Sequence, residues 1–266
     1  MDYKNICDQA IEVVQKVGEY IREEREKFSS SKIVVKGLNN FVTHVDKNSE
    51  IQLCEGLLKI VPEAGIIGEE GTNSKRGEEY NWIIDPVDGT TNFIHGLPPY
   101  AISVALVKGN IPVVGVILEV ASNECFSAYE GGKAFLNGKE INVSGAGKLS
   151  DSLIATGFPY SDYGRMEEFM DTLTFFMKKT HGLRRLGSAA TDLAYVASGR
   201  FEGLYEYGLH AWDIAAGIII LEKAGGKVSD FEGGSDYLFG GEIVASNGHV
   251  HEEFLDAVHG FMKKRK

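Results

Sequence analysis

Hydrophobic residues near the start of the chain recur first at helical spacing and then at strand spacing. In residues 3–28, apolar side chains return every three or four positions and charged side chains fill the other face, which predicts an amphipathic helix. Residues 32–46 predict two short strands around the turn sequence Gly-Leu-Asn-Asn. A second helix is expected from about Asn48 to Ile60, because Pro62 stops it.

The middle of the chain is rich in strand-like runs that are separated by Gly, Asn and Pro. After residue 95 the connections between these runs are short enough for antiparallel pairing. The runs are 65–70, 80–87, 101–109, 111–120, 124–132 and 133–139.

The last part of the chain alternates between strands and helices. Strands are expected at 152–158, 201–208 and 242–248, and helices at 165–180, within 184–200, at 211–226 and at 251–265. The last helix is expected to carry cations in its final turn and to present His249 and His251 to solvent.

The segregation of strands and helices predicts layers of α and β structure. The sequence Ser-Gly-Ala-Gly-Lys-Leu-Ser-Asp at about 145–152 divides the chain into two halves, 1–150 and 151–266. No flexible linker separates them, so we expect the two halves to pack closely.

The composition is ordinary for a soluble globular protein, with 43% apolar and 24% charged residues. The net charge of −11 argues against nonspecific binding to nucleic acid or to an anionic membrane. No stretch approaches the ~18 consecutive apolar residues of a membrane span, and the N-terminus lacks the apolar run of a signal peptide. We therefore expect neither nucleic acid nor a membrane as a partner.

Three cysteines, Cys7, Cys54 and Cys125, are present and form no Cys-x-x-Cys pair. Their odd number favours a reducing, cytoplasmic setting. We interpret all three as packing residues.

Two aspartates interrupt an otherwise apolar stretch at 82–93, Trp-Ile-Ile-Asp-Pro-Val-Asp-Gly-Thr-Thr-Asn-Phe. The stretch begins as a buried strand would and then places Asp85 and Asp88 around a proline. A buried carboxylate without a partner is costly, so another group must neutralise this pair. Taken alone, the pair also suits a turn.

Other carboxylates occupy comparable positions at the ends of predicted elements. Glu69 and Glu70 end the run 65–70, and Asp213 follows Trp212 at the start of an apolar helix. Taken alone, the glutamates suit a solvated loop and Asp213 suits a helix N-terminus. Taken together, such oxygens are the ligands that Mg²⁺ prefers, and two ions can bridge the oxygens of a reacting phosphoryl group.

The residues that follow Asp88 offer complementary chemistry. Gly89 lets the backbone approach a ligand closely, and if a helix starts there, the N–H groups of Gly89 and Thr90 form an anion cradle. The carbonyl of Val87 can face the same pocket. Cations beside an anion cradle indicate hydrolysis of a phosphate ester.

These motifs resemble the signatures of the inositol monophosphatase family, the magnesium-dependent, lithium-sensitive phosphatases of sugar phosphates. The resemblance covers nearly the whole chain and is carried by "GEE", "WIIDPVDGTTNF", "AWDIAAGIIILEKAGG", "HVDKNSE" and "LGSAATDLAYVASGRFEGLYEYGLHAWD". It implies an α+β fold, a layered α/β/α/β/α sandwich of the inositol monophosphatase and fructose-1,6-bisphosphatase type. It also implies a homodimer and a small-molecule phosphate ester as substrate.

The resemblance also implies roles for individual residues. A first, tightly bound Mg²⁺ would have Glu69, Asp85 and the carbonyl of Val87 as ligands. A second Mg²⁺ would have Asp85, Asp88 and Asp213 as ligands. Glu69 would also face a possible third, weakly bound ion. Thr90, linked to Asp46, would orient and activate the attacking water. For the substrate it implies contacts from Asp88, Gly89, Thr90, Ala189, Glu206 and Lys36.

The resemblance leaves the substrate open. Glu206 is typical of the enzymes that act on inositol phosphates, which favours myo-inositol 1-phosphate and hydrolysis by metal-activated water. Fructose 1,6-bisphosphate and NADP are alternatives within the superfamily. An alternative of another class is a regulatory protein that keeps the fold and binds transcription machinery. His95 and His210 lie in matching segments and suit structural roles.

Overall fold

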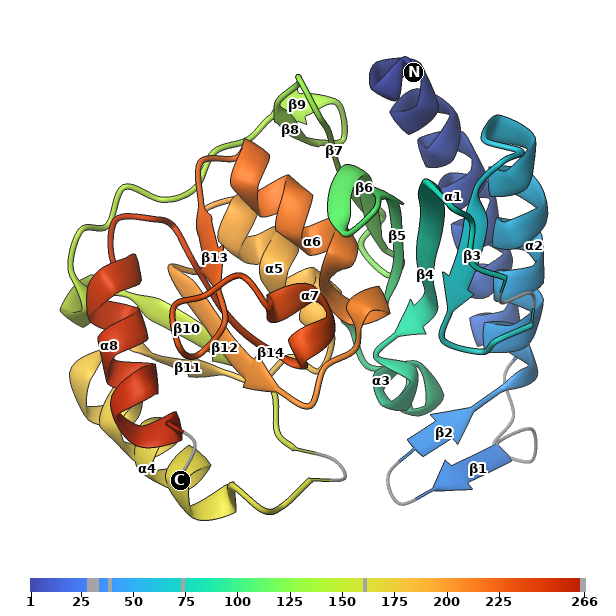
Figure 1. The fold of residues 1–266 in the computed structure, drawn as a ribbon. Helices are drawn as coiled ribbons and strands as arrows, with labels where there is room; N and C mark the ends of the chain where they lie inside the picture. The colour runs from blue at the N-terminus through green and yellow to red at the C-terminus, as the bar shows by residue number, and fades with distance from the viewer. Residues whose placement is uncertain (28–33, 38–39, 73–74, 160–161, 264–266) are drawn as a thin grey trace.

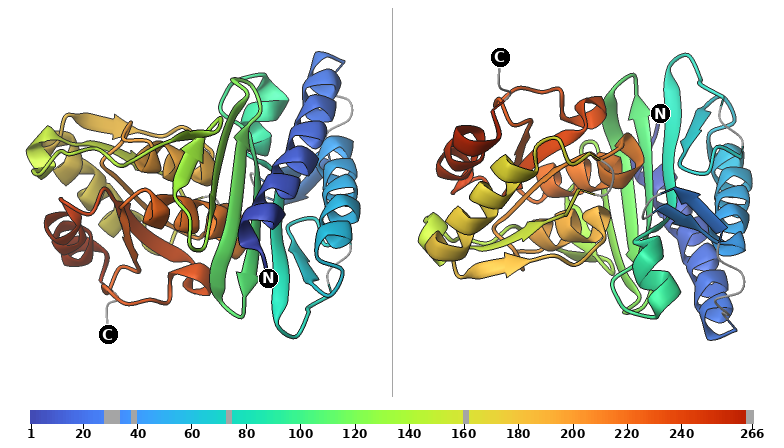
Figure 2. Two further views of the ribbon diagram at one scale, coloured as in Figure 1. Left: turned by 90° about the horizontal axis from the view of Figure 1, so that it is seen from above. Right: turned by 90° about the horizontal axis from the view of Figure 1, so that it is seen from below.

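The computed structural model describes residues 1–27, 34–37, 40–72, 75–159 and 162–263, with the backbone alone at 34–37 and 40–42. Within these residues, helices and sheets stack in five layers in the order α/β/α/β/α (Figure 1). Figure 2 shows the same layers from above and from below. The layered α+β sandwich predicted from the sequence is confirmed.

Pairs of helices form the first, third and fifth layers. These are α1 (Tyr3–Glu26) and α2 (His44–Ile60), then α5 (Ala189–Ala197) and α6 (Ala211–Lys223), then α4 (Met166–Lys179) and α8 (His251–Met262). The helix α2 begins four residues earlier than predicted, because Thr43 and Asp46 form a capping box at its N-terminus. Helix α1 was predicted at its observed start.

The larger sheet, between the first and third layers, has the strand order β3-β4-β5-β6-β7-β8-β9. Only β3 and β4 run parallel, and the later strands pair antiparallel as their short connections predicted. The predicted strand at 133–139 is instead a hairpin of two strands. The strands are β3 (Gly65–Gly68), β4 (Tyr80–Asp88), β5 (Ala101–Lys108), β6 (Ile111–Glu119), β7 (Glu124–Tyr129), β8 (Ala134–Leu136) and β9 (Lys139–Glu140).

Helices cover both faces of this sheet, which explains why its central strands are apolar throughout. In β4, Trp82 and Ile84 pack into the core beneath α1 and α2, whereas Ile83 packs into the core toward α5 and α6. Asp85 continues this alternation and so faces the third layer. The register shift between Asp85 and Asp88 marks a β-bulge where the sequence suggested a turn, and it keeps both aspartates on that face.

The smaller sheet, between the third and fifth layers, has the order β11-β10-β12-β14-β13. The edge strands β11 and β13 were not predicted, because three residues are too few to show a period. Its strands are β10 (Leu153–Thr156), β11 (Gly182–Arg184), β12 (Gly203–Tyr207), β13 (Lys227–Ser229) and β14 (Glu242–Ser246). The short elements are β1 (Val34–Gly37) and β2 (Asn40–Val42), which pair as predicted, α3 (Thr90–His95), the 3₁₀ turn Leu149–Asp151 and α7 (Tyr237–Gly240).

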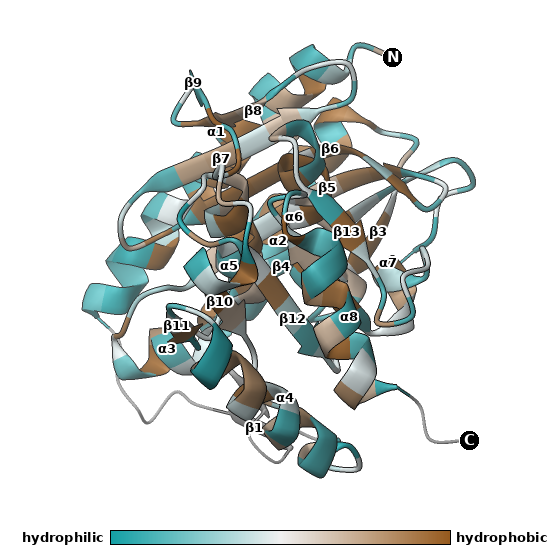
Figure 3. Ribbon diagram, turned by 90° about the vertical axis from the view of Figure 1, so that its left-hand side faces the viewer, coloured by the Kyte–Doolittle hydropathy of each residue, from teal (hydrophilic) through white to brown (hydrophobic). Residues whose placement is uncertain are grey.

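Figure 3 shows that the hydrophobic residues concentrate in the strands and helix faces of the interior, while the connecting loops are mostly hydrophilic. The three cysteines are buried and free, in agreement with their interpretation as packing residues. None of the described helices combines the length and the apolar character that a membrane crossing needs. The larger sheet ends at Glu140 and the smaller one starts at Leu153, and the division into two domains near residue 150 stays a prediction.

One expectation for the last helix is wrong. His251 is buried, with 1% of its surface exposed, and its Nδ1 lies 2.9 Å from the Ser246 hydroxyl. It packs at the start of α8, whereas His249 is exposed as expected. The described part of α8 ends at Met262, with His259 in its last turn and Lys263 as its C-cap, and the other cations expected at this end lie outside the described residues.

Candidate active site

A pocket of about 240 Å³ lies where the end of β4 meets the first turns of α3, α5 and α6. The N-terminus of each helix carries a partial positive charge, so this convergence favours anions. The strand β12 and the loop after β10 complete the wall. The predicted site residues that line the pocket are Glu69, Asp88, Gly89, Thr90, Ala189, Glu206 and Asp213.

Three carboxylates from separate parts of the fold meet at this pocket. Asp85, Asp88 and Asp213 each offer an oxygen, and these oxygens all lie within 4.8 Å of one another. The first two come from the bulged end of β4, and Asp213 comes from the first turn of α6. No ion is part of the structure, but an all-oxygen set of this kind fits a hard divalent cation.

A hydrogen bond from an N–H group holds one oxygen of each of these carboxylates. The N–H of Val87 donates to Asp85 Oδ1 at 3.0 Å, and the N–H of His210 donates to Asp213 Oδ2 at 2.6 Å. The second oxygen of each accepts no hydrogen bond from the N–H or hydroxyl groups of the described residues. The backbone therefore fixes the orientation of both carboxylates and leaves a ligand atom available.

Asp88 is fixed in the same way by the start of α5. Its Oδ2 accepts hydrogen bonds from the Ser188 hydroxyl at 2.7 Å and from the N–H of Ala190 at 2.8 Å. Ser188 is also the N-cap of α5. Ser188 was not among the predicted site residues, although a serine before Ala-Ala-Thr-Asp is a recognisable N-cap signal.

The cluster is electrostatically unfavourable without a cation. Burial raises the pKa of Asp85 well above its ordinary value, and the nearby charges of Glu69, Asp88 and Asp213 raise it further. Burial, then the charge of Asp88, raises the pKa of Asp213 in the same way. Burial raises the pKa of Asp88 to about 6, although the hydrogen bonds from the start of α5 oppose this change. A bound cation would relieve this repulsion.

Thr90 and Asp46 lie in contact, as predicted. The Thr90 hydroxyl lies 3.1 Å from Asp46 Oδ1 and 3.0 Å from the carbonyl oxygen of Val87. The other oxygen, Oδ2, accepts hydrogen bonds from the N–H and the hydroxyl of Thr43 at 2.9 and 2.6 Å. Burial raises the pKa of Asp46, and the hydrogen bonds from Thr43 and Thr90 oppose that change. Asp46 therefore joins the cap of α2 to the site.

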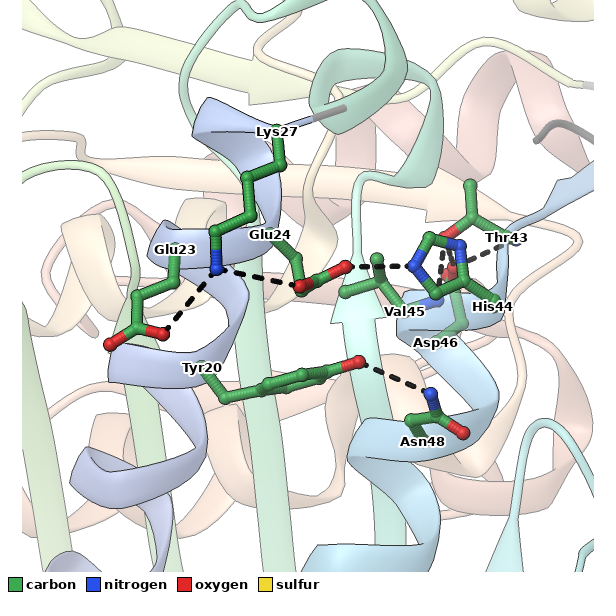
Figure 4. A network of polar contacts seen from close by, with 9 residues as sticks. All are labelled: Tyr20, Glu23, Glu24, Lys27, Thr43, His44, Val45, Asp46 and Asn48. Carbon is green, nitrogen blue, oxygen red and sulfur yellow. Dashed lines mark hydrogen bonds and ion pairs between the residues drawn. The ribbon is translucent and has the colours of Figure 1, made fainter. Parts of the chain in front are cut away.

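Figure 4 shows how this end of α2 is fastened to α1. The ring of His44 lies 2.8 Å from the carboxylate of Glu24, and Asn48 donates a hydrogen bond to the Tyr20 hydroxyl at 3.2 Å. Both contacts lie within one turn of Asp46. The position of Asp46 is therefore set by two helices and not by its own helix alone.

Gly89 stands at the N-cap of α3 with a φ of +91°, a conformation that glycine adopts without strain. A Cβ at this position would lie 3.1 Å from the carbonyl oxygens of both Gly187 and Pro99. The helix that the sequence left conditional is present from Thr90. The backbone at Gly89 and Thr90 thus lies at the pocket, as an anion cradle requires.

A glutamate that the sequence analysis did not assign holds the loop after β3. Glu50 is fully buried on α2, one turn after Asp46, and its Oε2 accepts the N–H of Glu70 at 2.8 Å. Its Oε1 accepts the N–H of Thr72 at 2.8 Å and the Thr72 hydroxyl at 2.5 Å. Glu69 lies between the end of β3 and Glu70, and its own N–H donates to the carbonyl of Ile84 at 3.2 Å.

The spacing of acidic residues in the motif that contains Glu50 could have predicted a role for this residue. In "HVDKNSE" the two acidic residues stand four positions apart, so a helix places them on one face. The motif was recognised, but only Asp46 was given a role. Glu69 does lie beside the cluster, since its charge is among the causes that raise the pKa of Asp85.

Glu206 lies on β12 at the far side of the pocket from β4. It is 8% exposed, and burial together with the charge of Asp88 raises its pKa to about 8. Gly157 makes room for it, because a Cβ there would overlap the Glu206 carboxylate. Ala189, the first residue of α5, lines the same wall. The side chain of Lys36 lies outside the described residues.

The comparison with known proteins identifies a single family. The sequence profile of the inositol monophosphatase family matches residues 2–263. An inositol-1-monophosphatase of Mesorhizobium japonicum is 39% identical over 249 residues, which are 93% of this chain and 94% of that protein. The Nus factor SuhB of Pseudomonas aeruginosa is 38% identical over 255 residues, 94% of each chain.

A solved structure agrees with these matches. The extragenic suppressor protein suhB of Bartonella henselae superposes with a TM-score of 0.90 at 36% identity, over 94% of this chain and 97% of that one. The family resemblance and the enzyme class predicted from the motifs are confirmed. The chain belongs to the inositol monophosphatase family and is a phosphatase, a hydrolase of phosphoric monoesters.

Proposed function

We propose that this phosphatase hydrolyses the phosphate ester of a small polyol, with myo-inositol 1-phosphate as the first candidate, and that it requires Mg²⁺. The observation that carries this proposal is that oxygens of Asp85, Asp88 and Asp213 lie within 4.8 Å of one another, beside a pocket that Glu206 also lines. The three aspartates suit metal-assisted phosphate chemistry, and Glu206 suits hydrogen bonding with hydroxyl groups. The name of the Mesorhizobium relative supports the same substrate.

The ligand assignment follows the family resemblance. Glu69, Asp85 and the carbonyl of Val87 would hold one ion, Asp85, Asp88 and Asp213 a second, and Glu69 would face a third, weak one. When bound, Mg²⁺ would stabilise the charge of the reacting phosphoryl group and make a nearby water a stronger nucleophile. The free carboxylate oxygens support this assignment, because each lies on a side chain whose other oxygen is already fixed.

Thr90 would position the attacking water. Its hydroxyl proton is directed toward Asp46 Oδ1 or the carbonyl of Val87, so a lone pair remains to accept a hydrogen bond from water. Asp46 is buried and held by Thr43, so it fixes this orientation. The N–H groups of Gly89 and Thr90 would hold the phosphate. Lys36 stays a prediction for the entrance of the site.

Glu50 would act as a positioning residue for Glu69. It fixes the backbone on the C-terminal side of Glu69, while the pairing with Ile84 fixes the backbone at Glu69 itself. Its helix also carries Asp46 one turn earlier. One rigid helix would therefore set both the water-orienting pair and one metal ligand.

A second function is raised by the relatives that are named Nus factor SuhB, which match this chain about as well as the inositol-1-monophosphatases do. The complete set of carboxylates favours catalysis as the main role of this site. A homodimer, lithium sensitivity and a cytoplasmic location stay predictions of the sequence.

The test of the proposal is a phosphate-release assay with inositol 1-phosphate, fructose 1,6-bisphosphate, NADP and histidinol phosphate, each with Mg²⁺ and with EDTA. We expect the highest kcat/KM for inositol 1-phosphate and no turnover in EDTA. Preference for another ester would change the substrate assignment. The absence of turnover on all four with Mg²⁺ would contradict the proposal and favour a binding role.

Mg²⁺ should raise the melting temperature of the protein, because it relieves repulsion within the acidic cluster. Asp213→Asn should reduce this increase and should raise the melting temperature in EDTA, since it removes one of the repelling charges. Differential scanning fluorimetry across a Mg²⁺ titration measures both effects. The exposed Asp171 provides the control Asp171→Asn, and equal Mg²⁺ responses of the two variants would refute the metal site.

Glu50→Ala should raise the Mg²⁺ concentration needed for half-maximal activity by roughly tenfold or more, as is typical when a residue that supports a metal ligand is lost. Glu50→Gln keeps one acceptor oxygen and should have a smaller effect. The exposed Glu55 on the same helix provides the control Glu55→Gln. Isothermal calorimetry with Mg²⁺ should show the same order, and an unchanged affinity in Glu50→Ala would assign Glu50 to stability alone.

Thr90→Ala should lower kcat by about 10²-fold, a common cost of losing a group that orients a proton transfer. The Mg²⁺ requirement should change little, because the hydroxyl is assigned to the water. Thr90→Ser keeps the hydroxyl and should recover most of the rate in a steady-state assay. A large rise in the Mg²⁺ requirement would instead place Thr90 among the metal ligands.

A further inference from the structure

Asp192 is a buried carboxyl group in the pocket wall that has no role in the chemistry described so far. It lies on α5, lines the same pocket as Glu206 and is 1% exposed. Its Oδ1 is buried and accepts no hydrogen bond from any group in the described part of the chain. A buried carboxyl group without a donor costs free energy in any protonation state, so its presence calls for an explanation.

The fold of α5 does not supply that explanation. The Ser188 hydroxyl caps the helix by accepting the N–H of Thr191 at 3.3 Å, and Asp88 accepts the N–H of Ala190. The first-turn N–H groups are thus served by other side chains. Among the described residues, none forms an ion pair with Asp192 within 4.0 Å.

The charged residues nearest to Asp192 also line the pocket. Glu206 and Asp88 are close enough for their charges to raise its pKa, after burial, and Arg185 opposes them. Arg185 also lines the pocket and lies over the ring of Phe158 at 5.4 Å. The wall next to the metal cluster therefore presents two carboxyl groups on a rigid helix and a rigid strand.

We propose that Asp192 is a specificity-determining residue that forms hydrogen bonds with hydroxyl groups of the substrate, next to Glu206. This inference rests on the proposed function and deepens it. A carboxyl group can bond a hydroxyl whether it is ionised or protonated, since it accepts in one form and also donates in the other. Two neighbouring carboxyl groups would select an ester whose carbon skeleton carries adjacent hydroxyls, because a substrate without them would leave both groups unpaired.

The test compares inositol 1-phosphate with cyclohexyl phosphate, which has the same ring and phosphate but no hydroxyls. Wild-type protein should have the higher kcat/KM for inositol 1-phosphate. Asp192→Val should raise the KM for inositol 1-phosphate at least tenfold and leave cyclohexyl phosphate within about twofold, as expected for lost binding of the hydroxyls. Asp192→Asn can still donate and accept, so it should fall between wild type and Asp192→Val.

Thermal melting without substrate separates recognition from a structural role. Removal of an unpaired buried carboxyl group should leave the melting temperature of Asp192→Asn unchanged or higher. A lower melting temperature together with equal losses on both esters would overturn the inference, and so would an unchanged KM in Asp192→Val.

The activity of the wild-type protein on the two esters distinguishes a failure of the proposed function from a failure of the role proposed for Asp192. Failure of wild-type protein to hydrolyse inositol 1-phosphate would contradict the proposed function itself. Hydrolysis of both esters with equal kcat/KM by wild type would leave the phosphatase assignment in place and overturn only the assignment of Asp192.

Discussion

The mutual repulsion of three clustered carboxylates is the constraint on which the rest of the site depends. One oxygen each of Asp85, Asp88 and Asp213 lies within 4.8 Å of the others, with Asp85 buried and the other two partly buried, and like charges repel strongly in such a setting. The fold holds them there through backbone N–H groups and a serine hydroxyl. Helix N-termini nearby offset part of the cost. The repulsion that remains favours the binding of a cation.

The scaffold positions this cluster by joining elements that are far apart in the sequence. The Asn92 side chain donates to the carbonyls of Pro99 and Leu186 at 2.7 and 2.8 Å, which ties α3 to the segment before α5. The Ser103 hydroxyl donates to the carbonyl of Trp212 at 2.9 Å, which ties β5 to the start of α6. The carboxylates from β4 and α6 therefore meet in a fixed geometry that neither half of the chain provides alone.

The sequence identified the carboxylates that come together better than it predicted their geometry. An apolar run that ends in Asp85 marks a buried strand, as the sequence predicted, but the face that Asp85 occupies follows only from the packing of its neighbours Ile83 and Ile84 in the folded structure. The bulge that brings Asp88 to the same side depends on pairing with β5, which no local pattern reveals. Glu50 and Asp192 went unassigned because an acidic residue in a helix is usually solvated, and only tertiary packing buries these two.

The acidic cluster and the wall that carries Glu206 and Asp192 are built from different strands and helices. The end of β4 and the start of α6 supply the acidic cluster, whereas Glu206 comes from the smaller sheet and Asp192 from α5. Under the proposed roles, a change at this wall would alter which alcohol fits without moving the acidic cluster, apart from the contact of α5 with Asp88. That contact links the two parts of the site. Because Asp88 is held by the first turn of α5 and Asp192 lies on the same helix, α5 sets the distance between these two carboxyl groups, and so would set the distance between the phosphate and the hydroxyls of the proposed substrate.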